Sequence, residues 1–160
     1  NLRWIVLVIM ILGGCSNESD NSYKEMPADF DFSLKYGVHG KREINTFNHF
    51  IVKDLVLKGT VQASLTLTEQ EMNDIYNEMM NANIMDDLDL GKEKECFVSP
   101  SSTSIWEIQM NGETKKFRYQ SYCDTPKDVL KLYQLEDFIE QIIMQREEYK
   151  RLPAANDSYK

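Results

Sequence analysis

The residues that most often carry out chemistry in proteins are few in this chain of 160 residues. Its two histidines, His39 and His49, stand ten residues apart across a turn, which gives no assurance that their rings converge on a metal. The carboxylates of Asp86, Asp87 and Asp89 suit a hard cation, but the segment lacks the glycine and the terminal glutamate of a calcium-binding loop. We therefore expect surface histidines, a solvated acidic loop, and no bound metal or other cofactor.

Nucleophilic catalysis needs a nucleophile beside a base and an orienting acid. Hydroxyls are concentrated between Ser99 and Ser104, but neither histidine is close to them in the sequence, and there is no Gly-x-Ser-x-Gly motif. The glycines form no phosphate-binding loop either. One set of long side chains is more typical of core packing than of a binding groove. Its members are Met72, Tyr76, Met79, Met80 and Met85. The sequence therefore predicts no catalytic centre.

Cys96 and Cys123 flank a predicted hairpin over residues 103–122 and predict a disulfide bond. The hairpin register, when extended, places residue 100 opposite Cys123. Cys96 lies four residues earlier, so it can reach Cys123 only if the chain bends at residues 99–102. The closed loop would contribute about 3 kcal/mol in the chain-entropy model. Two buried free thiols are the alternative. A metal site is disfavoured because no nearby histidine or third cysteine completes a ligand set.

Cys15 is a different case, because it follows an apolar run over residues 4–12 and two glycines. As a helix the run is about 13 Å long, too short for about 30 Å of bilayer hydrocarbon but typical of a signal-peptide core. Leu12-Gly13-Gly14-Cys15 resembles the site where bacterial lipoproteins are cleaved and their cysteine is acylated. We therefore expect residues 1–14 to be a signal peptide and Cys15 a lipidated amino terminus, anchored by two acyl chains. The alternative is an ordinary signal peptide cut nearby, with Cys15 free.

The chain beyond this leader is acidic and of single-domain size. Removing residues 1–14, which include Arg3, leaves 17 basic and 26 acidic side chains and a formal charge of −9. This charge argues against nucleic acid or an anionic membrane surface as the main partner. Polar residues 15–29 predict a flexible tether, residues 30–153 a single domain, and residues 154–160 a disordered tail.

Alternating apolar and polar side chains predict strands in the first half of the domain. Residues 30–36 alternate cleanly and end at Gly37 and Gly40. Residues 44–55 are rich in aromatic and β-branched side chains and predict a second extended segment of ambiguous phase. Residues 61–67 alternate again and predict a third strand. This pattern is typical of an antiparallel sheet with one solvated face.

The second half combines a hairpin with helices. Asn111-Gly112 predicts a type I′ turn, and in the resulting register Trp106 faces Phe117 while Glu107 faces Lys116 on the other side. Helix signals stand before and after the hairpin. They are a capping box at Thr68 and Glu71 with a helix to about residue 82, and a start with a side-chain cap at Asp124-Thr125-Pro126 with a helix to Leu152-Pro153. The predicted fold class is α+β, with a single antiparallel sheet of about five strands in the order βββ-α-ββ-α, packed on one face by two helices.

Several segments carry a family resemblance. They are Leu34-Lys35-Tyr36-Gly37, Asn45-Thr46-Phe47, Lys53-Asp54, Leu65-Thr66-Leu67-Thr68 with Ile75-Tyr76, and Glu148-Tyr149-Lys150-Arg151-Leu152-Pro153. They are similar to segments of small, uncharacterised lipoproteins of low-GC Gram-positive, Bacillus-like bacteria. The resemblance spans most of the chain beyond the leader. It implies the lipid anchor and the single domain, and it brings no activity with it.

The leading hypothesis is a lipid-anchored binding or adaptor domain, not an enzyme, on the extracytoplasmic face of the cell membrane. It would hold an envelope protein or peptide partner near the membrane, where tethering raises the effective concentration. One alternative is an envelope enzyme or metal-handling protein that uses His39, His49 or the acidic loop. Another is an inhibitor or immunity-type lipoprotein that protects the envelope.

Overall fold

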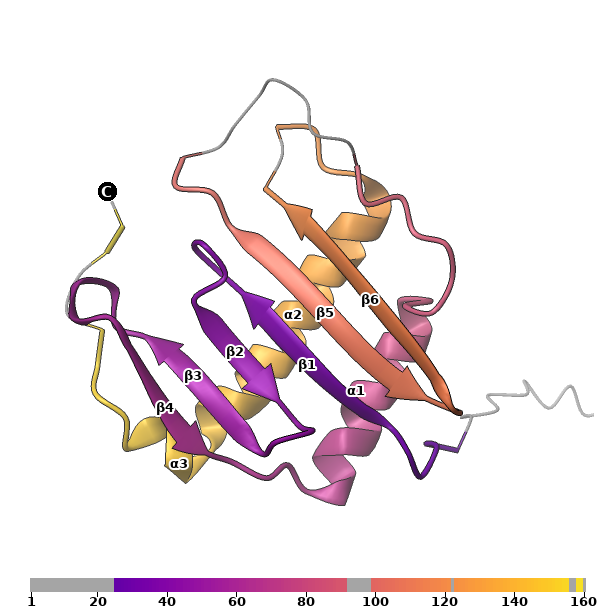
Figure 1. Cartoon of the computed structure of the whole chain (residues 1–160), viewed down its shortest axis with the longest axis horizontal. Helices are drawn as coiled ribbons and strands as arrows, with labels where there is room; N and C mark the ends of the chain where they lie inside the picture. The colour runs from indigo at the N-terminus through magenta and orange to yellow at the C-terminus, as the bar shows by residue number, and fades with distance from the viewer. Residues whose placement is uncertain (1–24, 92–98, 122, 156–157, 160) are drawn as a thin grey trace, which may run out of the picture.

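The computed structural model describes residues 25–91, 99–121, 123–155 and 158–159, and these form one antiparallel sheet with helices on one face (Figure 1). The strands are β1 (Asp31–Tyr36), β2 (Arg42–Asn45), β3 (Phe50–Asp54), β4 (Thr60–Ser64), β5 (Thr103–Met110) and β6 (Glu113–Gln120). The helices are α1 (Glu69–Asn81), α2 (Lys127–Gln145) and α3 (Glu147–Lys150), with a short 3-10 turn, η1 (Val56–Lys58). The predicted α+β class is therefore confirmed, with six strands instead of about five.

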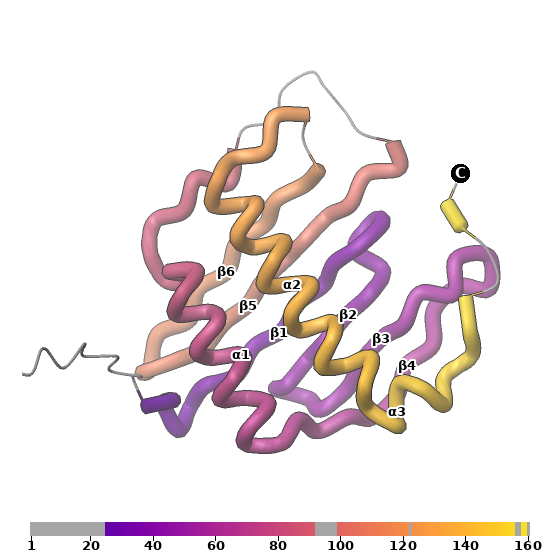
Figure 2. The backbone as a smooth tube through the Cα atoms, turned by 180° about the vertical axis from the view of Figure 1, so that it is seen from behind, coloured from indigo at the N-terminus to yellow at the C-terminus, as the bar shows by residue number. Residues whose placement is uncertain are grey.

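The sheet has the strand order β4-β3-β2-β1-β5-β6. The first four strands form a meander, and α1 then carries the chain behind the sheet from the β4 edge to β5, which pairs with β1 (Figures 1 and 2). Both long helices lie on the same face, which leaves the other face to solvent (Figure 2). Ion pairs lie on the solvated face. They are Lys35 with Glu43 at 3.8 Å and the predicted pair of Lys116 with Glu107 at 3.0 Å.

The sixth strand comes from residues 44–55, which we predicted as one extended segment. The chain turns at residues 46–49, between β2 and β3, with His49 at a φ of 54°. The Thr46 hydroxyl accepts the Phe32 amide at 2.8 Å and donates to the Asp31 carboxylate at 2.7 Å. This buried hydroxyl ties the turn to β1, so the segment folds back instead of continuing.

The hydrophobic core lies between the sheet and the two long helices. The alternation in β1 and β5 places Phe32, Leu34, Trp106 and Ile108 there with no exposed surface. The predicted hairpin register is confirmed, because Trp106 pairs with Phe117 and Met110 with Glu113. Trp106 and Phe117 stack with their ring centroids 6.2 Å apart.

The helix predictions are partly wrong at their ends. The helix α2 begins at Lys127 after an N-cap at Pro126, and no side chain caps it. The predicted continuous helix to Leu152 is broken at Arg146, whose backbone is extended (φ −76°, ψ 139°). This break lets the Arg146 guanidinium reach Glu71 of α1 at 2.7 Å and Glu148 of α3 at 3.1 Å. The ion pairs hold the end of α2 against the start of α1.

The capping box at the start of α1 is confirmed and can be tested. The Thr68 hydroxyl accepts the Glu71 amide at 3.2 Å, and the Glu71 carboxylate accepts the Thr68 amide at 2.7 Å. We expect Thr68→Ala to lower the free energy of unfolding by about 1 kcal/mol, because the Glu71 amide in the first turn of the helix loses its hydrogen-bond acceptor. Urea unfolding followed by circular dichroism measures the change. Thr66→Ala, at an exposed position two residues earlier, is the control, and equal losses in both variants would contradict the capping role.

Candidate functional site

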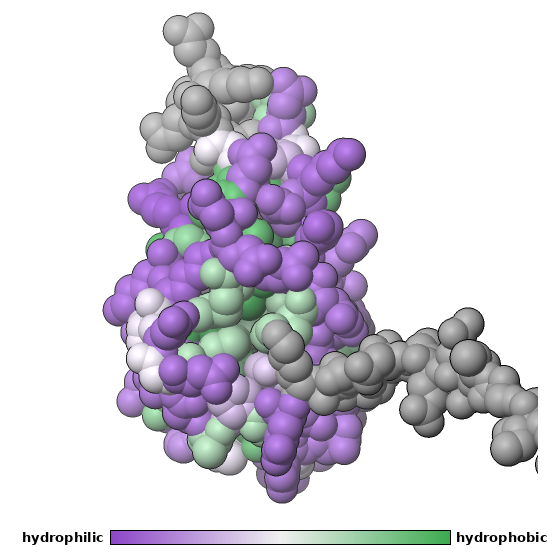
Figure 3. Space-filling model, turned by 90° about the vertical axis from the view of Figure 1, so that its right-hand side faces the viewer, coloured by the Kyte–Doolittle hydropathy of each residue, from purple (hydrophilic) through white to green (hydrophobic). Residues whose placement is uncertain are grey.

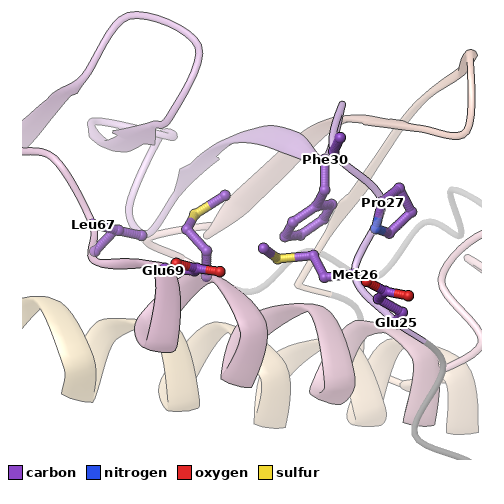
Figure 4. Close-up of a pocket in the computed structure, with 8 residues that line it drawn as sticks. Glu25, Met26, Pro27, Phe30, Leu67 and Glu69 are labelled. Carbon is purple, nitrogen blue, oxygen red and sulfur yellow. The ribbon is translucent and has the colours of Figure 1, made fainter.

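A groove opens where residues 25–30 meet the start of α1 (Figure 4). Its volume is about 600 Å³. The lining side chains are mostly apolar, with a carboxylate from each of the two segments. They are Glu25, Met26, Pro27, Ala28, Phe30, Leu67, Glu69 and Met72. The groove therefore combines an apolar surface with negative charge at its rim.

One wall of the groove is fixed by Asp29. Its carboxylate accepts the backbone amides of Asn111 at 2.8 Å and Gly112 at 2.7 Å, at the turn between β5 and β6. These amide donors, Gly112 first and Asn111 second, hold the pKa of Asp29 below its ordinary value. The next residue, Phe30, is buried and packs edge-on against Tyr76 of α1 with ring centroids 5.3 Å apart. Residues 25–29, predicted as the end of the tether, thus lie against the folded domain.

The other wall is held by the start of α1 and by Arg146. The capping box fixes the first turn of α1, which carries Glu69 and Met72. Arg146 binds Glu71 at 2.7 Å and donates to the Thr66 carbonyl at 3.3 Å. Because these contacts stand on both sides of Leu67 in the sequence, its position is set by the same ion pair that joins α1 to α2.

The arrangement of the groove suits an apolar group that has a cation beside it. In Figure 4 the Phe30 and Met26 side chains lie at the centre, with Leu67 and Glu69 at one end and Glu25 at the other. On the side of the molecule where the described residues begin, Figure 3 shows apolar surface in a shallow hollow framed by hydrophilic side chains. Thioethers such as Met26 adapt to ligands of different shape. A few polar groups around an apolar pocket are typical of binding sites.

A second feature is a chain of buried hydrogen bonds between α2 and the sheet. The Trp106 Nε1–H donates to the Tyr119 hydroxyl at 3.0 Å, and that hydroxyl donates to the Glu136 carboxylate. The Ser104 hydroxyl also bonds to Glu136. Burial raises the pKa of Glu136 above its ordinary value, although the hydrogen bonds from Ser104 and Tyr119 and the charge of Arg42 oppose the shift. Burial, followed by the nearby Glu136 charge, raises the pKa of Tyr119.

A partly buried ion pair lies beside this network, one turn further along α2. Arg42 of β2 pairs with Glu140, one helical turn beyond Glu136, and its guanidinium lies over the Tyr36 ring, 4.4 Å from the centroid. Burial first, and the Glu140 charge second, raise the pKa of Tyr36. The hydrogen bonds and this ion pair therefore join α2 to three strands, and Glu136 is the buried carboxylate among them.

The sequence of α2 contains a signal for the buried carboxylate, which is its position within an apolar stripe. Buried residues on α2 include Leu132, Ile139 and Ile143, and Glu136 lies between them at helical spacing. A glutamate within an apolar stripe indicates a partnered polar group in the core. The groove had no such local signal, because its two walls are about 40 residues apart in the sequence. The methionine set was predicted as core, and Tyr76 and Met79 are indeed buried, but Met72 also lines the groove.

The histidines do not converge. His39 lies in the turn between β1 and β2, and His49 in the turn between β2 and β3, at opposite ends of the meander (Figure 1). The acidic loop is held by side chains of the domain: Lys115 donates to the Ile84 carbonyl at 3.0 Å, and Asp128 accepts the Asp89 amide at 3.0 Å. Within residues 25–91, 99–121, 123–155 and 158–159, no group of three His, Cys, Asp or Glu side chains is placed to hold a metal ion.

The cysteine predictions fall largely outside the described residues. Cys15 and Cys96 lie among residues 1–24 and 92–98, respectively. Cys123 is disulfide-bonded, and its pairing with Cys96 stays a prediction. Among the described helices, none has the length and apolar character needed to cross a bilayer.

The raised pKa of Glu136 predicts how stability depends on pH. A folded-state pKa above the unfolded value means that the network stabilises fully at low pH, and that this contribution is lost as pH rises through the folded pKa. We expect Glu136→Gln to unfold at the same urea midpoint as the wild type near pH 4, and at a higher one as pH rises. Asp137→Asn, on the exposed side of the same turn, is the matched control. Parallel pH profiles for wild type and Glu136→Gln would refute this role.

The groove and the Glu136 network differ in their exposure to solvent. The groove faces solvent and has the composition of a binding site, whereas the Glu136 network is buried and joins secondary-structure elements. No residue of the network lines the groove. No protein-family model matches the chain, and no curated protein matches it.

Proposed function

We propose that this chain is a lipid-anchored, extracytoplasmic binding or adaptor domain whose groove holds a segment of an envelope protein or peptide. The groove carries this proposal, because it joins an apolar surface to two carboxylates, Glu25 and Glu69. A ligand segment with one apolar side chain next to a lysine or arginine matches both properties. The formal charge of −9 beyond residue 14 disfavours anionic partners.

The position of the groove supports the same function. The groove includes residues 25–28, which follow directly on the segment predicted to lead to the anchor at Cys15. A partner held there would stay close to the membrane surface, where confinement raises its effective concentration. The resemblance to small lipoproteins is in line with this placement.

Binding to the groove can be measured through its methionines. With ¹³C-labelled methionine methyl groups, a peptide carrying Leu-Lys should shift the signals of Met26 and Met72 and leave those of Met110 and Met144 unchanged. The affinity should be weak, with a Kd of about 10 µM to 1 mM, because a short peptide loses much conformational freedom on binding. Glu25→Gln combined with Glu69→Gln should weaken binding about three- to tenfold.

The control is a Leu-Glu peptide of equal length, which brings like charge to the rim and should bind less tightly than Leu-Lys. Equal affinity for both peptides would show that the carboxylates do not select the ligand. A Leu-Lys peptide that shifts no methionine signal at millimolar concentration would exclude the groove as the binding site.

The anchor has its own test. We expect the mature protein from membranes to begin at Cys15 and to carry the mass of a diacylglyceryl group, and Cys15→Ala to abolish both the mass increment and the membrane association. Intact-mass spectrometry of the membrane fraction measures this, with Ser19→Ala as a control outside the motif. An unmodified Cys15 in the membrane-bound wild type would disprove lipidation.

A further inference from the structure

The turn between β3 and β4 displays an unusually exposed apolar side chain. Leu57, in η1, is 78% exposed, more than any other large apolar side chain of the described residues. The next are Leu130 at 51%, Met144 at 44% and Ile105 at 42%. An exposed leucine is common on protein surfaces. The conformation of the turn therefore decides whether Leu57 is held in a position suited to binding.

The backbone of this turn is held in one strained conformation. The Leu55 amide donates to the Gly59 carbonyl at 2.8 Å, and the Val56 amide donates to the Asp54 carboxylate at 2.9 Å. Val56 has a φ of 63°, in the left-handed region that β-branched residues rarely adopt and in which they are strained. Leu55 is buried beneath the turn. The strain is thus sustained by specific contacts, and the outcome is a fixed loop that presents Leu57.

The side chain after Leu57 completes a pattern that matches the groove. Lys58 is exposed and directly follows Leu57, so the loop displays an apolar side chain beside a cation. The groove offers an apolar surface beside Glu25 and Glu69. Figures 1 and 2 show the β3–β4 turn and the start of β1 on opposite sides of the molecule. A chain therefore cannot place its own loop in its own groove.

We propose that the groove binds the β3–β4 loop of a second copy of this chain, with Leu57 in the apolar groove and Lys58 against the rim carboxylates. This inference rests on the proposed function of the groove and identifies its partner. The contact joins two different surfaces, so it is heterologous and links copies head to tail. One loop buries a small area, so the association is weak in solution and is favoured among copies confined to a membrane.

Sedimentation of the soluble chain tests the proposal. The described residues form one sheet and one core, so the chain from residue 15 onward, with Cys15→Ser, carries the whole fold. Its average mass should rise with concentration between about 10 µM and 1 mM. Leu57→Asp should weaken association about tenfold or more, because it replaces the buried apolar group with a charge that the rim repels.

A complementary pair of variants identifies the two surfaces. Ala28→Arg fills the groove and brings a cation to its rim, so this variant alone should associate at least about tenfold more weakly than the wild type, as should Leu57→Asp. An equimolar mixture should form dimers and nothing larger, since the intact loop of one variant meets the intact groove of the other. Equal melting temperatures for the variants and the wild type show that folding is unaffected.

Two results overturn the inference. One is a wild-type chain that remains monomeric at 1 mM, and the other is a Leu57→Asp variant that associates as strongly as the wild type. The Leu-Lys peptide distinguishes the two proposals: if it shifts Met26 and Met72 while the chain stays monomeric, the groove binds a different partner and the proposed function stands. If neither occurs, both proposals fail.

Discussion

Strand β1 is the element on which the rest of the structure depends, because it alone joins the two parts of the sheet. Its residues pair with β2 on one side and β5 on the other. The alternation that buries Phe32 and Leu34 against the helices also sets the direction of the residues that precede the strand. A slip of one residue would exchange the buried and solvated faces. The core and one wall of the groove are thus fixed by the same register.

The groove shows how polar contacts can fix an apolar site. Asp29 binds the β5–β6 turn and Arg146 binds Glu71, and each contact lies just beyond the apolar lining. The Asp29 contact is exposed and the Arg146–Glu71 pair is partly buried, and each has a definite geometry. Their combined effect is that two segments distant in sequence keep a constant separation. A preformed groove loses less conformational freedom on binding than a mobile one.

Local structure could be predicted from the sequence, and distant contacts could not. The hairpin register followed from Asn111-Gly112 because a two-residue turn fixes the pairing of every residue after it. The turn at residues 46–49 carries no such signal, since it depends on the contact of Thr46 with β1. The break at Arg146 depends likewise on Glu71, 75 residues away. The groove depends on two such distant contacts, Asp29 with the β5–β6 turn and Arg146 with Glu71, so no local pattern revealed it.

The positions of the carboxylates are compatible with the binding role proposed for the groove. A catalytic acid or base must touch the reacting group, and its pKa has to be suited to proton transfer. Glu136, whose pKa is raised, is only 9% exposed and its partners Ser104, Trp106 and Tyr119 belong to the core. The groove carboxylates, Glu25 and Glu69, are exposed to water at the rim. The proposed binding role requires a charge that selects a partner and an apolar surface that retains it, and within the part of the chain that the structure describes both lie in the groove.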